Sequence, residues 1–203
     1  MSLRKADTDF LRGPTRSDAA QRLGITTRAL HWATAALVAC GFGAAWLFNA
    51  LGPGPSAAKL VEVHRSIGLC ILLVTVARAI WRATHPLPHV PSALWERWLA
   101  ATVQAMLYIA LLAMPVLGWL GSNAQGDTVA FLGVVQLPDL VEANQVLGDR
   151  LFVLHGWLGY GILALLTLHI AGALRHRFIK KDGVLQRMTT GRPVGPTSDA
   201  RTR

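Results

Sequence analysis

The stretch LFVLHGWLGYGILALLTLHIAGAL, residues 151–174, decides the fold of this chain. Its only ionisable side chains are those of His155, His169 and Tyr160, and as a helix it is long enough to cross the roughly 30 Å hydrocarbon core of a bilayer. His155 and His169 are fourteen positions apart. This spacing is close to four helical turns, so the two side chains share one face at depths about 21 Å apart. One membrane-spanning helix therefore presents imidazoles at two depths.

Three further apolar stretches are also long enough to span a bilayer. They cover residues 29–51, 64–81 and 99–120, and only Arg65 and Arg78 interrupt them with a charge. The 203-residue chain is 52% apolar and 15% charged, so too little polar chain remains to cover four such helices in water. The sequence therefore predicts an all-α integral membrane protein, folded as a four-helix transmembrane up-and-down bundle.

The basic residues predict how this bundle is oriented. Of the 20 Lys and Arg, only Lys59, Arg65 and Arg150 lie near the bundle end that follows spans one and three, and the other 17 flank the opposite end. Because cytoplasmic loops carry the basic excess, both termini are expected in the cytoplasm. The net charge of +9 is then a topology signal that favours contact with anionic lipid head groups and disfavours a nucleic-acid partner.

The four spans divide the chain into three parts. We expect residues 1–28 to form a basic cytoplasmic arm, which shows no apolar core of a cleavable signal peptide, residues 29–177 the membrane domain, and residues 178–203 a cytoplasmic tail. The tail is expected to be loose beyond Lys180.

The connections between the spans are predicted from their prolines and glycines. Residues 52–63 and 121–150 are expected to be outer loops, the second with a short helix after Pro138. The inner loop over residues 84–98 is rich in proline at its start, so a short surface helix is expected only near its end.

An up-and-down order fixes which histidines lie at the same depth. His31 begins the first span near the inner surface, and His64 begins the second near the outer surface. Pairing by depth joins His64 with His155 and His31 with His169. In the other pairing, two imidazoles near opposite membrane surfaces would have to bind the same metal ion. Ionisable groups inside spans are costly and usually functional, although four histidines held by ordinary hydrogen bonds remain an alternative.

Two imidazoles at each depth favour haem over zinc. Zinc sites use three or four protein ligands, and neither a carboxylate nor Cys40 or Cys70 completes such a set. Haem iron needs only two axial ligands from the protein. The spacing therefore predicts two bis-histidine haems, and filled axial positions indicate a protein that transfers single electrons and has no catalytic residue beyond the haems.

Two glycines and one arginine extend these predicted sites. Gly68 and Gly159 each follow a histidine by four positions, so each leaves its helix face open one turn along, either for a flat macrocycle or for close helix packing. Arg78 lies fourteen positions after His64, at the inner depth, where it can pair with a haem propionate or extend toward the inner surface.

Other ionisable groups are assigned by their position. Arg65 and Arg150 are candidates for the propionates of the outer haem. Surface positions are expected for His85, His89 and His176.

The motifs now in view resemble those of the bacterial cytochrome b561 family, over about residues 25–188. They are Arg28-Ala-Leu-His-Trp32, His64 with Gly68 and the later Arg78 and Trp81-Arg82, Pro115 to Trp119, His155-Gly-Trp-Leu-Gly-Tyr160 continuing to His169, and the ending Ala173 to Phe178 followed by Asp182 and Leu185 to Met188. The resemblance implies a four-helix bundle in the bacterial inner membrane with two b-type haems, ligated by His31, His64, His155 and His169.

One branch of that family is superoxide oxidase, which takes electrons from superoxide at the outer side and reduces ubiquinone. The resemblance favours this function, with membrane lipids, superoxide and ubiquinone as partners. The alternative is a haem b electron conduit that anchors a partner dehydrogenase or hydrogenase, and a non-redox membrane protein is a third possibility.

Charge at the outer face bears on the choice between them. Spans two and four both begin outside, so two positive helix ends are expected beside the outer haem, where they would attract an anion. The outer segments hold three basic and five acidic residues, a formal balance of 3 − 5 = −2. The outer face as a whole is therefore not expected to attract superoxide, and any attraction must come from a few basic groups close to the outer haem.

Overall fold

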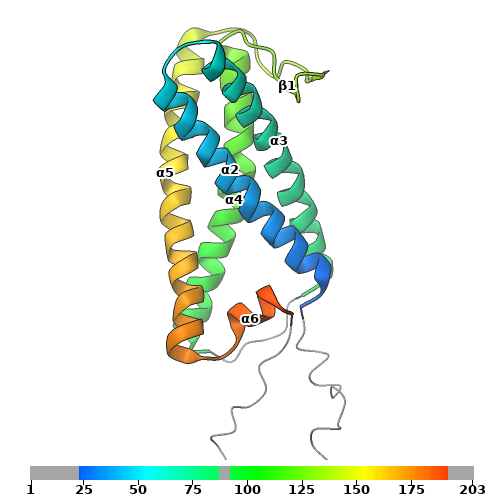
Figure 1. Ribbon diagram of the computed structural model, residues 1–203, viewed down its shortest axis with the longest axis vertical. Helices are drawn as coiled ribbons and strands as arrows, with labels where there is room; N and C mark the ends of the chain where they lie inside the picture. Colours follow the sequence, from blue (N-terminus) through cyan, green and yellow to red (C-terminus); the bar gives the residue numbers. More distant parts are fainter. Residues whose placement is uncertain (1–22, 87–91, 192–203) are drawn as a thin grey trace, which may run out of the picture.

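Four long helices run side by side in the computed structural model, which describes residues 23–86 and 92–191 (Figure 1). They are α2 (Ile25–Leu51), α3 (Pro55–Thr84), α4 (Leu94–Ala124) and α5 (Gln145–Arg175). Each contains a stretch apolar and long enough to cross a membrane. The predicted four-helix membrane bundle is confirmed.

The helices are longer than the apolar stretches that predicted them. Residues 52–63 were expected to be a loop, but α3 begins at Pro55, so this prediction is wrong. Proline suits the first turn of a helix because its missing N–H has no partner there in any case. The short helix expected near the end of the loop over residues 84–98 is instead the beginning of α4.

The bundle consists of two helix pairs with a shared apolar layer. Helix α2 packs on α3 and α4 packs on α5, while α3 and α4 join the two pairs. Val38 of α2, Ala110 and Leu111 of α4 and Ile162 of α5 are buried in one cluster. Ile162 lies seven positions from both His155 and His169, so this core separates the two histidine depths.

A small hairpin lies beside one end of the bundle, called here the hairpin end (Figure 1). Strands β1 (Ala130–Phe131) and β2 (Val135–Gln136) pair antiparallel in the connection from α4 to α5. No helix lies between Pro138 and the start of α5 at Gln145, which corrects the expectation of a short helix in this segment.

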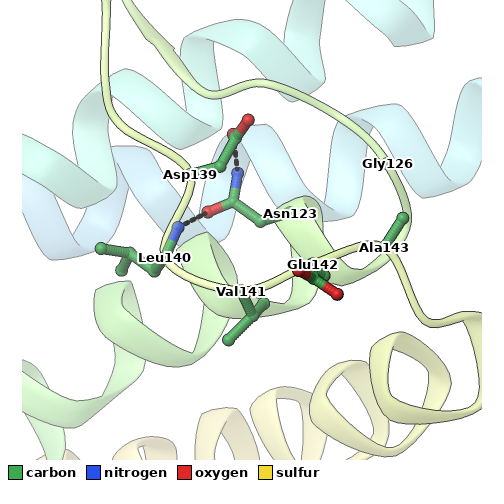
Figure 2. A pocket seen from close by; sticks show the side chains of 7 residues that line it. All are labelled: Asn123, Gly126, Asp139, Leu140, Val141, Glu142 and Ala143. Atoms are coloured by element: carbon green, nitrogen blue, oxygen red, sulfur yellow. Dashed lines mark hydrogen bonds between the residues drawn. The ribbon is translucent and has the colours of Figure 1, made fainter.

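Asn123 explains why the chain after Pro138 runs as a loop (Figure 2). This side chain is 3% exposed. Its amide donates to Asp139 Oδ1 at 2.8 Å and to the Asp127 carbonyl at 3.1 Å, and its oxygen accepts from the Leu140 N–H at 3.0 Å. These bonds fix the loop against α4 until Asn144 caps α5 by accepting from the Leu147 N–H.

At the opposite end, called here the terminal end, the chain folds back onto the bundle (Figure 1). A π-helical turn, η1 (His176–Lys180), leads to the short helix α6 (Val184–Thr189). Trp32 Nε1 donates to the Met188 carbonyl at 3.0 Å, and Arg28 donates to the Thr189 carbonyl at 2.9 Å. The expectation that the tail is loose beyond Lys180 is therefore wrong for its described part, because α6 is bonded to the start of α2.

Candidate haem sites

The structure brings the four span histidines together in the two pairs that their depths predicted. His64 of α3 faces His155 of α5 with ring centroids 6.1 Å apart, and His31 of α2 faces His169 of α5 with centroids 6.2 Å apart. The first pair lies toward the hairpin end and the second toward the terminal end. Each pair joins one helix of the α2–α3 pair to α5, although the backbones of α2 and α5 do not pack closely.

These separations fit a metal ion between two imidazoles. A bond from a metal to an imidazole nitrogen is about 2 Å long, and each ring centroid lies about another 1 Å beyond its nitrogen. Two rings that share an iron therefore have centroids about 6 Å apart, as both pairs do. Among residues 23–86 and 92–191, no group of three or more His, Cys, Asp or Glu side chains could hold a metal ion, so two nitrogens are the donor set at each depth.

At the hairpin-end pair, backbone carbonyls select the nitrogen that is free for a metal. His64 Nδ1 donates to the Gly41 carbonyl of α2 at 2.9 Å, and His155 Nδ1 donates to the Met114 carbonyl of α4 at 3.1 Å. A donor at Nδ1 leaves the lone pair on Nε2, and metal-binding histidines are commonly held in this way. Both rings are thus prepared for ligation through Nε2.

His64 and His155 line a cavity of about 150 Å³. Gly68 and Gly118 line it, together with apolar side chains such as Phe48 and Phe152. Trp119 also lines it, and its indole N–H is buried without a hydrogen-bond acceptor. An apolar slot with one unpaired donor suits a flat, mostly apolar group that carries acceptor oxygens, and haem with its propionates is such a group.

The two predicted glycines have different surroundings. Gly68 lines the cavity, and a Cβ there would meet only Pro115 at 3.9 Å. A Cβ at Gly159 would come within 3.3 Å of the Met114 side chain. Gly68 therefore fits the predicted approach of a macrocycle, whereas Gly159 serves the packing of α5 on α4.

In the terminal-end pair, a cationic side chain is hydrogen-bonded to one of the two histidines. Arg78 Nη2 donates to His31 Nδ1 at 3.0 Å, and the guanidinium lies 5.3 Å from the centre of the Tyr108 ring. Because a guanidinium only donates, His31 accepts at Nδ1 and carries its proton on Nε2. Ligation through Nε2 would require Arg78 to release His31, which would leave the guanidinium for a carboxylate such as a propionate.

The structure places the two arginines that were expected to pair with propionates of the outer haem. Arg65 lines the cavity but is bonded to Asp127 at 2.5 Å. Arg150 is exposed in the first turns of α5.

The helix ends are also farther away than expected. Helices α3 and α5 begin nine and ten positions before His64 and His155, about 14–15 Å along the axis. The partial charge of a helix end acts only within the first turn. The expectation that two helix ends attract an anion at this site is therefore wrong.

The other histidines lie apart from both pairs. His85 is exposed and stacks on Trp81 at 3.7 Å. His176 is half-buried and bonded to Asp182 at 2.6 Å, so the surface position expected for it is only partly right. His89 lies outside the described residues.

Several contributors to the sites were not predicted. The carbonyls of Gly41 and Met114 leave no mark in a sequence, because every residue has a carbonyl. Trp119 belongs to the Pro115–Trp119 motif but was given no role there. Tyr108 lies in the predicted third span, and only its helical phase relative to Arg78 could have identified it.

Comparisons with known proteins bear on these sites. Residues 22–191 match the family model described as prokaryotic cytochrome b561. The chain is 31% identical over 171 residues to Cytochrome b561 homolog 2 of Escherichia coli K12, covering 83% of this chain and 91% of the relative. It is 26% identical over 162 residues to the Yersinia pestis protein named Probable superoxide oxidase CybB, covering 78% and 90%.

Proposed function

This chain belongs to the prokaryotic cytochrome b561 family, whose members are haem b membrane electron-transfer proteins, and we propose that it oxidises superoxide and passes the electrons to ubiquinone. Two superoxide anions lose one electron each and leave as O2. One ubiquinone takes up both electrons with two protons and becomes ubiquinol.

The observation that carries this proposal is the arrangement of four imidazoles in two facing pairs along one bundle. We propose that His64 with His155, and His31 with His169, each hold one haem b. Haem with two histidine ligands supplies one-electron transfer without an open coordination position for oxygen. The pairs lie on opposite sides of the Ile162 core, so electrons have a carrier toward each membrane face.

The hairpin end is the proposed site of superoxide oxidation. If His64 and His155 both hold the haem, superoxide would give up its electron at the cavity and would not bind to the metal. Arg65 lines this cavity with 20% of its side chain exposed. Its Nη2 bonds to Asp127, and since a guanidinium has five N–H donors, further donors remain for a small anion. The relative named as a probable superoxide oxidase supports this donor.

Stopped-flow mixing tests the proposal directly. Purified oxidised protein is mixed with superoxide, and ubiquinone is added afterwards while haem absorbance is followed. We expect fast haem reduction that ubiquinone reverses and that superoxide dismutase prevents. Haems that dithionite reduces but superoxide does not would contradict the proposal and favour the conduit function, with a partner dehydrogenase or hydrogenase as donor.

The pair of Arg65 and Asp127 provides matched variants for this experiment. Asp127→Asn removes the carboxylate that neutralises Arg65, so the bimolecular rate with superoxide should rise several-fold at low ionic strength. Arg65→Gln should lower the rate. Because salt screens exposed charges over about 10 Å at 0.1 M, both effects should shrink at high salt. Rates that ignore both substitutions would show that superoxide does not react near Arg65.

A further inference from the structure

The hairpin β1–β2 exposes large apolar side chains at its tip. Leu132 is 69% exposed, Val134 81% and Val135 58%. They are consecutive apart from Gly133, and the β1–β2 hairpin to which they belong lies beside the bundle (Figure 1). A cluster of this kind in water would be a site of aggregation or of contact with another surface.

The turn of the hairpin places a leucine in a backbone conformation that this residue type disfavours. Leu132 and Gly133 have φ of 52° and 69°, and the Val134 N–H donates to the Phe131 carbonyl at 3.1 Å. Positive φ at both central residues defines a type I′ turn, which favours Asn or Gly at the first of them. A bulky leucine at positive φ is uncommon, so an apolar side chain is present where the turn itself would favour a polar one.

The hairpin is fixed to α3 at a definite level. The Leu132 N–H donates to the buried Ser66 hydroxyl at 2.9 Å, and this hydroxyl donates to the Glu62 carbonyl. Lys59, Glu62 and Arg65 lie on the side of Ser66 toward the hairpin end, whereas residues 67–77 carry no charge. Ser66 therefore marks the border between the charged and the membrane-spanning part of α3.

From these observations we propose that the hairpin tip, Leu132, Val134 and Val135, inserts into the interface of the lipid leaflet at the hairpin end. Strand β1 packs on α3, and Leu73 and Val76 are exposed in the uncharged stretch of that helix, where a membrane-spanning bundle faces lipid. The same segment begins with Val129, which is 2% exposed and lines the cavity of His64 and His155. Lipid contact at the tip would thus help to hold Val129 in place at the wall of that cavity.

Fluorescence quenching in vesicles tests this contact. In the full chain with Cys40→Ala and Cys70→Ala, the variants Val134→Cys and Ala143→Cys are each labelled with a nitrobenzoxadiazole dye and reconstituted in phosphatidylethanolamine–phosphatidylglycerol vesicles. Ala143 is an exposed residue of the loop before α5 and serves as the control. We expect a nitroxide placed near the lipid head group to quench the dye at position 134, and aqueous iodide to quench the dye at position 143.

The outcomes separate lipid from other surroundings. Quenching of the dye at position 134 by iodide, as at position 143, would overturn the proposal. Protection from both quenchers would also overturn it and indicate a protein partner or a second copy of the chain.

A second variant separates lipid contact from the fold of the hairpin. Leu132→Asn suits the type I′ turn but removes one apolar side chain from the tip. We expect haem absorbance to stay at the level of the unsubstituted chain, while the dye at position 134 loses part of its quenching by the lipid nitroxide. Unchanged lipid quenching would show that Leu132 takes no part in the contact and would overturn its assignment to the tip.

Discussion

At the scale of single residues, the two imidazole pairs differ in what holds them. His64 and His155 donate to backbone carbonyls, which makes their rings more electron-rich. His31 faces the guanidinium of Arg78, and no carboxylate within the described part of the chain pairs with that cation. A nearby positive charge favours the ferrous over the ferric form, because the ferric form carries one more positive charge.

Arg78→Leu should therefore lower the midpoint potential of the haem proposed at the terminal end. We expect at least a tenfold change in its redox equilibrium constant, which is about 59 mV for a one-electron couple. Spectroelectrochemical titration measures the two potentials, and Arg78→Lys, which keeps the charge, should lie closer to the unsubstituted chain. An unchanged or raised potential in Arg78→Leu would show that Arg78 does not act on this haem.

At the scale of elements, helix α4 approaches α5 closely where Gly118 lies against His155. A Cβ at Gly118 would lie 3.2 Å from Cε1 and 3.4 Å from Nδ1 of the His155 ring. The added methyl group of Gly118→Ala should displace that ring and weaken its bond to the Met114 carbonyl. Overpacking of this kind costs about 1–3 kcal/mol, and we expect haem at the hairpin-end pair to be partly lost.

The control for this substitution is Gly156→Ala on α5. Gly156 neighbours His155 in sequence, but a Cβ there would meet nothing within 4 Å. Its haem content and absorbance spectrum should match those of the unsubstituted chain. Equal haem loss in the two variants would show that crowding of His155 by a side chain at position 118 is not the cause of the loss.

The elements also show how far sequence reasoning reached. Four spans were predictable because apolar length alone identifies them. The β1–β2 hairpin was not, since each strand has two residues and the turn begins with Leu132 where Asn or Gly is the usual signal. Helix α6 was missed because a helix of six residues is marginal alone and depends on bonds from Arg28 and Trp32, more than 150 positions away.

At the scale of the whole molecule, the charge distribution predicts the orientation of the bundle. Most Lys and Arg flank the terminal end, so that end should face the cytoplasm. Green fluorescent protein fused after Arg203 should fluoresce, and alkaline phosphatase inserted at Ala143 should be active. The opposite pattern would place the His64–His155 pair on the cytoplasmic side and remove the proposed access for external superoxide.

The same scale explains why the histidine pairs were predictable. An up-and-down bundle allows only His64 with His155 and His31 with His169 to share a depth, and the structure places them 6.1 and 6.2 Å apart. Tautomers and neighbouring charges depend on contacts across helices, such as His64 with Gly41 or Arg65 with Asp127. Those contacts require the helix rotations, which apolar length does not determine.

The central claim is that these imidazoles hold two haems, and the haem content per polypeptide tests it most directly. Pyridine haemochrome assays should give two haem b in the unsubstituted chain, one in His64→Ala, one in His31→Ala and none in the double variant. A single haem or none in the unsubstituted chain, or loss of the same haem in both single variants, would contradict the account.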